Sequence, residues 1–263
     1  MRISIYLLCI AQAATITVAV LSVTISPTLG KVLSGQETWA TIPYGIQFLA
    51  LLVATLPIAT LLLRFGRKPT LAIAAIVGMV GCLTSSYAIY ADRFILFALA
   101  QACIGVGICA GNYYRFCALE LSDQSNKPMA MSLVMSAGVG AALLGPTISR
   151  LGWSFEEISV YSIMYLIAAG LFLLSGTAVL VANIPMSAPR IGILIPKKIK
   201  TNEFPKGWML GILSGAIGYF FMNFLMIEYP MHLMSAGMSL HTMSYMIELH
   251  VLGMFLPSFF SGF

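Results

Sequence analysis

Apolar stretches alternate with short polar connections along almost the whole chain. Eight stretches reach the length of a membrane helix, at residues 3–25, 42–63, 70–90, 94–118, 129–151, 158–184, 207–228 and 241–263. A helix of about 20 residues spans the roughly 30 Å hydrocarbon core of a bilayer. Because every backbone polar group in lipid must be paired within its own segment, we predict an all-α, polytopic transmembrane bundle of about eight helices.

The overall composition supports this prediction. Of the 263 residues, 59% are hydrophobic and only 9% are charged, whereas about 25% are charged in an average globular chain. The deficit runs along the entire length, which excludes a water-soluble globule. The formal net charge of +5 does not indicate a nucleic-acid partner, because the basic residues lie in the connections between apolar stretches.

Basic residues concentrate in alternate connections, and this asymmetry predicts the orientation. Eleven fall on one side: Arg2, Arg64, Arg67, Lys68, Arg115, Lys127, Arg190, Lys197, Lys198, Lys200 and Lys206. Only three fall on the other side: Lys31, Arg93 and Arg150. Since Lys and Arg favour the cytosol, we predict a multi-pass protein of the bacterial inner membrane with a cytoplasmic N-terminus. Its first stretch begins like a secretory signal but stays apolar to Ile25, which favours an uncleaved helix.

A proline-rich, basic connection at residues 185–206 divides the chain after six apolar stretches and before two. We predict an N-terminal six-helix bundle at 1–184, a cytoplasmic linker at 185–206, and the start of a C-terminal bundle at 207–263. Because the last apolar stretch has no polar tail, we also expect the chain to be a fragment of a longer protein.

The connection after the second stretch is a tight basic turn that contains Arg64, Gly66, Arg67 and Lys68. Its pattern resembles the loop G-x-x-x-D-R-x-G-R-K of the major facilitator superfamily, and the resemblance implies that the turn gates transport on the cytoplasmic side. Two positions depart from the family pattern, since Ala59 replaces a glycine and Leu63 replaces an aspartate. The carboxylate that the family is thought to use in switching between its inward-open and outward-open states is therefore missing at this position.

A second family-like segment lies in the fifth stretch and contains Gly138, Gly140, Gly145 and Pro146. It resembles the family's glycine-rich helix ending in Gly-Pro, in which small residues permit close helix packing and proline loosens one turn. The antiporter form of this segment continues with two more glycines. Ser149 and Arg150 stand there instead, so the resemblance does not imply antiport.

Residues 113–116 and 250–258 resemble a bacterial subgroup of the superfamily that includes proteins assigned to riboflavin uptake. The superfamily resemblance covers residues 1–263 and implies secondary active transport of a small organic solute by alternating access, without a cofactor. Family members usually have twelve helices, four more than this chain. The alternative is therefore a truncated, non-transporting remnant or a partial subunit, completed by self-association or by a separately encoded C-terminal half.

Polar residues within the apolar stretches are the candidate solute contacts: Gln12, Gln47, Gln101, Asn112, Tyr219, Asn223 and His250. Taken singly, each residue type more often joins two helices. As a set spread over several stretches, they predict a polar cavity near the middle of the membrane. In the fourth stretch, five residues follow one helical stripe that should face protein or water: Gln101, Gly105, Ile108, Asn112 and Arg115.

Two ionisable residues lie well inside the eighth stretch, Glu248 and His250, whereas His241 stands at its boundary. Ionisable groups in lipid are costly and are functional candidates by default, so both are candidates for proton coupling. Because they are two residues apart, they point to nearly opposite sides of a helix. We favour His250 as the cavity-facing residue, because the ordinary pKa of histidine suits proton exchange near neutral pH.

Metal, cofactor and enzyme chemistry lack supporting patterns. The five cysteines lie in apolar stretches without C-x-x-C spacing or histidine partners, so we expect neither disulfides nor a metal site. The motifs H-E-x-x-H and G-x-S-x-G are absent, and no nucleophile stands beside a plausible base. We predict that the chain is not an enzyme, with an integral-membrane enzyme kept as the weaker alternative.

Overall fold

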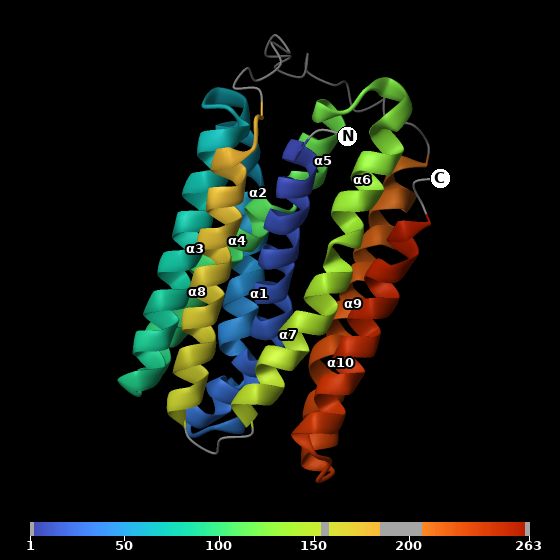
Figure 1. Cartoon of the computed structure of the whole chain (residues 1–263). Helices are drawn as coiled ribbons and strands as arrows, with labels where there is room; N and C mark the ends of the chain where they lie inside the picture. Colours follow the sequence, from blue (N-terminus) through green and yellow to red (C-terminus); the bar gives the residue numbers. More distant parts are fainter. Residues whose placement is uncertain (1–2, 154–157, 185–206, 261–263) are drawn as a thin grey trace.

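The computed structural model describes residues 3–153, 158–184 and 207–260, and the regular structure in these ranges is helical (Figure 1). The helices are α1 (Ile3–Ser34), α2 (Ile42–Arg64), α3 (Arg67–Tyr90), α4 (Phe94–Gly111), α5 (Tyr114–Leu121), α6 (Lys127–Ser136), α7 (Gly138–Trp153), α8 (Ile158–Val181), α9 (Trp208–Ser235) and α10 (Leu240–Phe255). Short 3-10 turns lie at η1 (Glu37–Trp39), η2 (Gln124–Asn126) and η4 (Leu256–Phe259). The predicted all-α transmembrane bundle is confirmed.

In the described part of the chain, 7 helical segments are long and apolar enough to cross a membrane. They correspond to the first seven predicted stretches. The eighth stretch forms α10, which has 16 residues and is followed by η4 with Pro257. Proline has no backbone N–H and disfavours a continuing helix, so the last stretch is shorter as an α-helix than predicted. The predicted linker at 185–206 lies outside the described residues.

Helix α1 extends beyond the end predicted for it. It has 32 residues and continues to Ser34 instead of stopping near Ile25. The additional turns are packed against the protein, since Leu29 is fully buried. Gly30 lies so close to the carbonyl oxygen of Ala40 that a Cβ atom would not fit between them. Tertiary packing therefore stabilises the part of α1 that follows Ile25, where the apolar pattern ends.

Two predicted spans contain a break instead of one continuous helix. Helices α4 and α5 meet at Asn112 and Tyr113, whose N–H groups donate to Cys109 at 3.2 Å and Ala110 at 3.0 Å. These bonds reach back three residues, as in a 3-10 turn, and change the direction of the side chains that follow. Helices α6 and α7 meet at a single residue, Ala137, whose N–H donates to the carbonyl of Leu133 at 3.2 Å.

Helix α1 lies at the centre of the bundle, where it packs against α8, α7, α4 and α5 (Figure 1). Helix α3 packs against both α4 and α8, and α2 packs on α4. We call the end that carries the α2–α3 turn and the start of α6 the basic end, because it holds Arg64, Arg67, Lys68 and Lys127. The chain begins at this end (Figure 1). Its location in the cytosol stays a prediction.

Three groups of buried apolar side chains hold the helices together. One surrounds Leu8 and Tyr114 toward the basic end, and a second surrounds Leu21 and Phe97 toward the opposite end. The third and smallest joins α1 to α7 and α10 and includes Val20. Helix α10 is therefore attached to the first six stretches mainly through α7.

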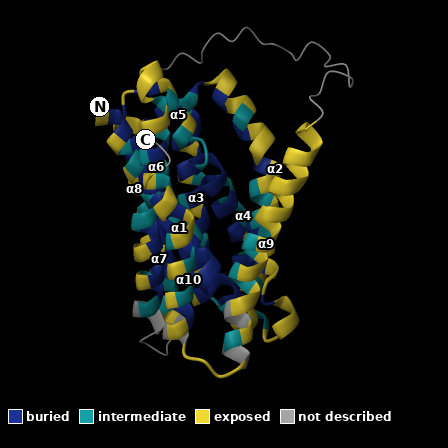
Figure 2. Cartoon of the chain, turned by 90° about the vertical axis from the view of Figure 1, so that its right-hand side faces the viewer, coloured by how far each residue is buried: buried dark blue, intermediate teal, exposed yellow. Residues whose placement is uncertain are grey.

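Exposed residues run along the outer faces of the helices (Figure 2), and many of them have large apolar side chains. Leu52 and Leu56 of α2 are 69% and 78% exposed, and no residue is buried in the apolar window of α9. A contiguous surface of this kind would cause aggregation in water, whereas lipid tails solvate it. The chain is a multi-pass membrane protein.

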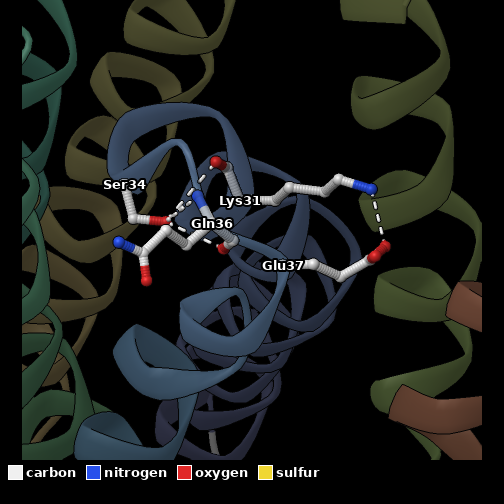
Figure 3. A network of polar contacts seen from close by, with 4 residues as sticks. All are labelled: Lys31, Ser34, Gln36 and Glu37. Atoms are coloured by element: carbon white, nitrogen blue, oxygen red, sulfur yellow. Dashed lines mark hydrogen bonds and ion pairs between the residues drawn. The ribbon is translucent and has the colours of Figure 1, made fainter.

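The connection between α1 and α2 is closed by local polar contacts (Figure 3). Lys31 Nζ lies 2.6 Å from Glu37 Oε1. The Ser34 hydroxyl donates to the carbonyl of Gly30 at 2.6 Å, and the backbone N–H of Gln36 donates to Ser34 Oγ at 3.2 Å. The ion pair is exposed, so it contributes little stability by itself and mainly fixes the path of the turn.

The glycine-rich segment of α7 permits close packing at two of its three glycines. A Cβ atom at Gly138 would collide with the ring of Phe255 in α10, and one at Gly145 would lie 2.7 Å from Val20 Cγ1 in α1. A Cβ atom at Gly140 would meet nothing within 4 Å. Pro146 also contributes, because its carbonyl accepts a hydrogen bond from Ser244 Oγ at 3.1 Å.

We predict that Gly145→Val destabilises the protein and that the matched substitution Gly140→Val does not. The larger side chain at 145 overpacks the α1–α7 contact, at a cost of about 1–3 kcal/mol. Thermal unfolding in detergent, followed by size-exclusion fluorescence, measures the difference. Equal melting temperatures for the two variants would contradict this packing.

Candidate solute-binding cavity

A cavity of about 270 Å³ lies among α1, α2, the α4–α5 break, α6, α9 and α10. Its polar lining consists of Gln12, Tyr44, Gln47, Asn112, Arg115, Tyr219 and Asn223. Most of the remaining lining is apolar and includes Phe48, Met135, Met222, Met226, Met254 and Phe255. An apolar pocket with a few converging polar groups is the usual form of a small-molecule site.

Five of the predicted solute contacts meet in this one cavity: Gln12, Gln47, Asn112, Tyr219 and Asn223. They come from α1, α2, the α4–α5 break and α9. The pattern of polar residues in the apolar stretches therefore identified a common location. That these residues contact a solute stays a prediction.

A hydrogen bond from Ser22 of α1 holds the buried side chain of Gln47 in place. Ser22 Oγ donates to Gln47 Oε1 at 2.5 Å, which leaves the amide NH₂ as the group available for a further partner. Helix α2 can approach α4 closely here, because a Cβ atom at Gly105 would overlap the carbonyl oxygen of Gln47. Gly105 therefore sets the position of Gln47 at the cavity wall.

Gln12 lines the cavity, and its side-chain oxygen lacks a hydrogen-bond partner in the described part of the chain. Its side chain is 3% exposed, and its Oε1 atom has no hydrogen-bond partner among the described residues. A buried acceptor without a partner is rare and costs free energy, so a water molecule or a bound molecule is expected to complete it.

The α4–α5 break places Asn112 and Arg115 at the cavity. Arg115 Nη1 lies 3.9 Å from Met135 Sδ, and its guanidinium carbon lies 5.1 Å from the centre of the Phe116 ring. Arg115 belongs to the helical stripe of the fourth stretch, but it is not among the predicted solute contacts. Tyr44 and Phe48 also line the cavity and are not among the predicted contacts. Tyr44 lies three residues before Gln47, on the same face of α2, and this spacing was the available signal.

Gln101 lies elsewhere, between α4, α8 and α1. It is fully buried, and its Nε2 donates to the hydroxyl of Tyr165 at 2.8 Å. Ser22 Oγ lies 3.2 Å from Gln101 Oε1 and thereby connects this residue to the network behind Gln47. The structure does not bring Gln101 to the cavity with the other candidates, because internal partners satisfy its amide.

His250 lines a second cavity of about 290 Å³ between α9 and α10, beside Tyr229 and Met246. Its Nε2 atom is buried and has no hydrogen-bond partner among the described residues. The structure thus separates His250 from the cavity that contains Gln12. Its predicted role in proton coupling stays a prediction.

Glu248 points away from His250, as the helical spacing predicted, and faces α7. Its Oε2 lies 2.5 Å from Arg150 Nη1. The Arg150 guanidinium lies 4.5 Å from the centre of the Tyr245 ring, and Arg150 Nη2 donates to Thr147 Oγ1 at 2.9 Å. Only 16% of the Arg150 side chain and 15% of the Glu248 side chain are exposed, so this ion pair is largely shielded from water and joins α7 to α10.

The family-like basic turn has an acidic partner from another helix. Gly66 adopts a φ of 89°, which favours glycine, and its carbonyl accepts a hydrogen bond from Thr70 Oγ1 at 2.8 Å. Arg67 forms an ion pair with Glu120 of α5. Arg64 is exposed and Lys68 is half-buried. Arg67 therefore has a carboxylate partner even though Leu63 replaces the family's aspartate.

Comparison with known proteins identifies relatives over nearly the whole chain. No protein-family model matches the chain. The Riboflavin transporter RfnT of Brucella anthropi is 29% identical over 99% of this chain. Two proteins of Bacillus subtilis named uncharacterized MFS-type transporters, YddS and YdeG, are 24% and 22% identical over 91% of this chain.

These relatives confirm the resemblance to transporters of the major facilitator superfamily (MFS). All three are named as transporters, in agreement with the prediction that the chain is not an enzyme. The chain spans 66%, 58% and 59% of the lengths of RfnT, YddS and YdeG, which is less than two thirds of each.

We predict that water reaches the cavity but does not reach Gln101. Cysteines introduced at Gln47 or Asn223 should react with a small, membrane-impermeant thiol reagent, whereas a cysteine at Gln101 should stay unmodified. The background variant replaces the native thiols with alanine or serine at Cys9, Cys82, Cys103, Cys109 and Cys117. Mass spectrometry of the labelled protein gives the extent of reaction. Equal labelling at 47 and 101 would contradict the separation of the two sites.

Proposed function

Because the chain is similar over its length to MFS transporters, we propose that it takes part in secondary active transport of a small organic solute across the bacterial inner membrane. The observation that carries this proposal is the cavity, in which polar residues from four separate helical regions converge. Transporter sites form in this way near the membrane midplane, between units that move relative to each other. The basic end lies in the cytosol in this proposal, which follows the distribution of Lys and Arg.

The chemistry of the cavity favours a planar solute with several hydrogen-bonding groups. Amides from Gln12, Gln47 and Asn112 offer both donors and acceptors. Tyr44 and Tyr219 offer aromatic faces that can stack on a ring. Riboflavin, the solute in the name of one relative, combines an aromatic ring system with carbonyl and hydroxyl groups. It is the first solute to test.

Alternating access requires two units that change their contacts. We assign these units to residues 1–184 and 207–263, with the linker at 185–206 between them. In this assignment, α7 and α10 form an interface between the two units, through Gly138 and Phe255 and through the pair of Arg150 and Glu248. The motion would have to rearrange both contacts. The turn that contains Arg67 would act as the gate at the basic end, through its ion pair with Glu120.

We predict that Gln12→Leu lowers riboflavin uptake into proteoliposomes by about tenfold, as expected for loss of one hydrogen bond worth about 1.4 kcal/mol. Leucine keeps a similar volume, so helix packing should be preserved. The exposed residue Gln36, in the connection after α1, provides the control variant Gln36→Ala. Absence of riboflavin uptake by the wild-type chain would refute riboflavin as its solute, and equal uptake by both variants would exclude Gln12 as a contact.

Proton coupling at His250 is the second part of the proposal. Its buried, unpartnered Nε2 lies beside a cavity, where a proton could be exchanged with water. Glu248 is the less favoured candidate, because an ion pair with Arg150 occupies its carboxylate.

We predict that His250→Gln abolishes the part of uptake that depends on a proton gradient and preserves membrane insertion, because glutamine keeps hydrogen-bonding capacity without titrating near neutral pH. Uptake is measured with and without an imposed gradient. The matched control is His232→Gln, since His232 is an exposed histidine in the last turn of α9. If the His250→Gln variant keeps the full gradient-driven uptake, His250 has no role in proton coupling.

A second candidate function is that of a partial subunit, which transports only after self-association or with a separately encoded partner. The exposure of α9 favours it, since Tyr219 is 54% exposed although it lines the cavity. Another polypeptide could complete that wall. Uptake by monomeric chain, reconstituted at less than one copy per vesicle, would refute this candidate.

A further inference from the structure

Arg115 is the charged residue of the cavity lining. The other polar side chains that line the cavity are amides and tyrosines, and no carboxylate is among the lining residues. The described part of this wall therefore carries a positive charge with no negative charge to balance it.

The surroundings of Arg115 do not neutralise it. The carboxylates that form ion pairs in the described ranges are Glu37, Glu120 and Glu248, and their partners are Lys31, Arg67 and Arg150. Among the described residues, the Arg115 guanidinium interacts with a methionine sulfur and an aromatic ring, which are weak partners for a guanidinium group. Its Nε atom is buried without a hydrogen-bond partner among the described residues.

Burial adds to the cost of this charge. Arg115 is half-buried beside the cavity, in the first turn of α5 and directly after the α4–α5 break. A half-buried arginine without a carboxylate partner among the described residues is costly unless an anion approaches it.

We propose that Arg115 determines specificity in the cavity by binding an anionic group of the solute, such as a phosphate or a carboxylate. The planar body of the solute would lie against Tyr44 and Tyr219, and its anionic group would lie at the α4–α5 break. The inference rests on the proposed transport function and adds the charge class of the solute. It also disfavours cationic solutes, because the described lining of the cavity offers them no carboxylate.

Riboflavin and riboflavin 5′-phosphate form a matched pair of probes, because they share the ring system and differ by one phosphate group. A phosphate monoester carries a charge of about −1.5 to −2 at pH 7. Binding is measured by quenching of flavin fluorescence with the purified chain in nanodiscs of phosphatidylcholine. We expect the wild-type chain to bind the phosphate ester at least about tenfold more tightly than riboflavin, as for a charge-assisted hydrogen bond.

Substitutions at Arg115 test whether this residue causes the preference. Arg115→Gln should bring the affinity ratio of the two flavins to about one, and Arg115→Lys should retain most of it, because lysine keeps the charge. The control is Arg93→Gln, an exposed arginine at the start of α4. Equal affinities in the wild-type chain would overturn the proposal, as would an unchanged ratio in the Arg115→Gln variant that still binds flavin.

Two further measurements test whether the anion that binds Arg115 is a lipid headgroup or free phosphate instead of the solute. Nanodiscs with phosphatidylglycerol test a lipid headgroup at Arg115, and millimolar inorganic phosphate tests a free anion. If either competitor abolishes the preference for the phosphate ester, Arg115 binds that competitor, and its role in solute selection is overturned.

The outcomes also separate the two proposals. Riboflavin uptake without a preference for the phosphate ester refutes only the role of Arg115. A binding preference without transport refutes only the transport function. If neither flavin binds, both proposals fail for flavins.

Discussion

The structure depends on one constraint, which is that polar groups in lipid must find their partners inside the protein. Backbone groups satisfy it by forming helices, and this accounts for the long helical segments of the described chain. The breaks in these helices occur where protein or the cavity surrounds the backbone. At Asn112 and Tyr113 the freed N–H groups bond three residues back, so the chain can turn at the cavity without exposing them to lipid.

The same constraint divides the buried polar side chains into two groups. Some are paired between helices, as shown by Gln101 with Tyr165 and by Thr15 Oγ1, which lies 3.1 Å from Ser175 Oγ, although Ser26 Oγ and Ser85 Oγ are buried without a partner among the described residues. Such pairs specify how the helices fit together. Gln12, Arg115 and His250 each keep a buried polar atom without a partner among the described residues, and all three lie beside a cavity. Unsatisfied groups at cavities are where function is expected.

Charged pairs provide the contacts that a transporter would have to rearrange. The pair of Arg150 and Glu248 joins α7 to α10 within a poorly hydrated interface. The pair of Arg67 and Glu120 ties the basic turn to α5. The second pair also shows how a sequence can depart from a family pattern, since a carboxylate on α5 faces the turn that lacks its usual aspartate.

The sequence alone determined the helices, because the lipid requires long apolar runs and the backbone allows them only one hydrogen-bonded form. It also indicated most of the cavity, since polar residues such as Gln47 and Asn223 are conspicuous in apolar stretches. The tertiary structure decided where each polar side chain lies. Gln101 is satisfied by internal partners, His250 lines a second cavity, and Arg115 and Tyr44 line the first one. That distinction depends on contacts between residues far apart in the chain, such as Ser22 with Gln47, which no local pattern encodes.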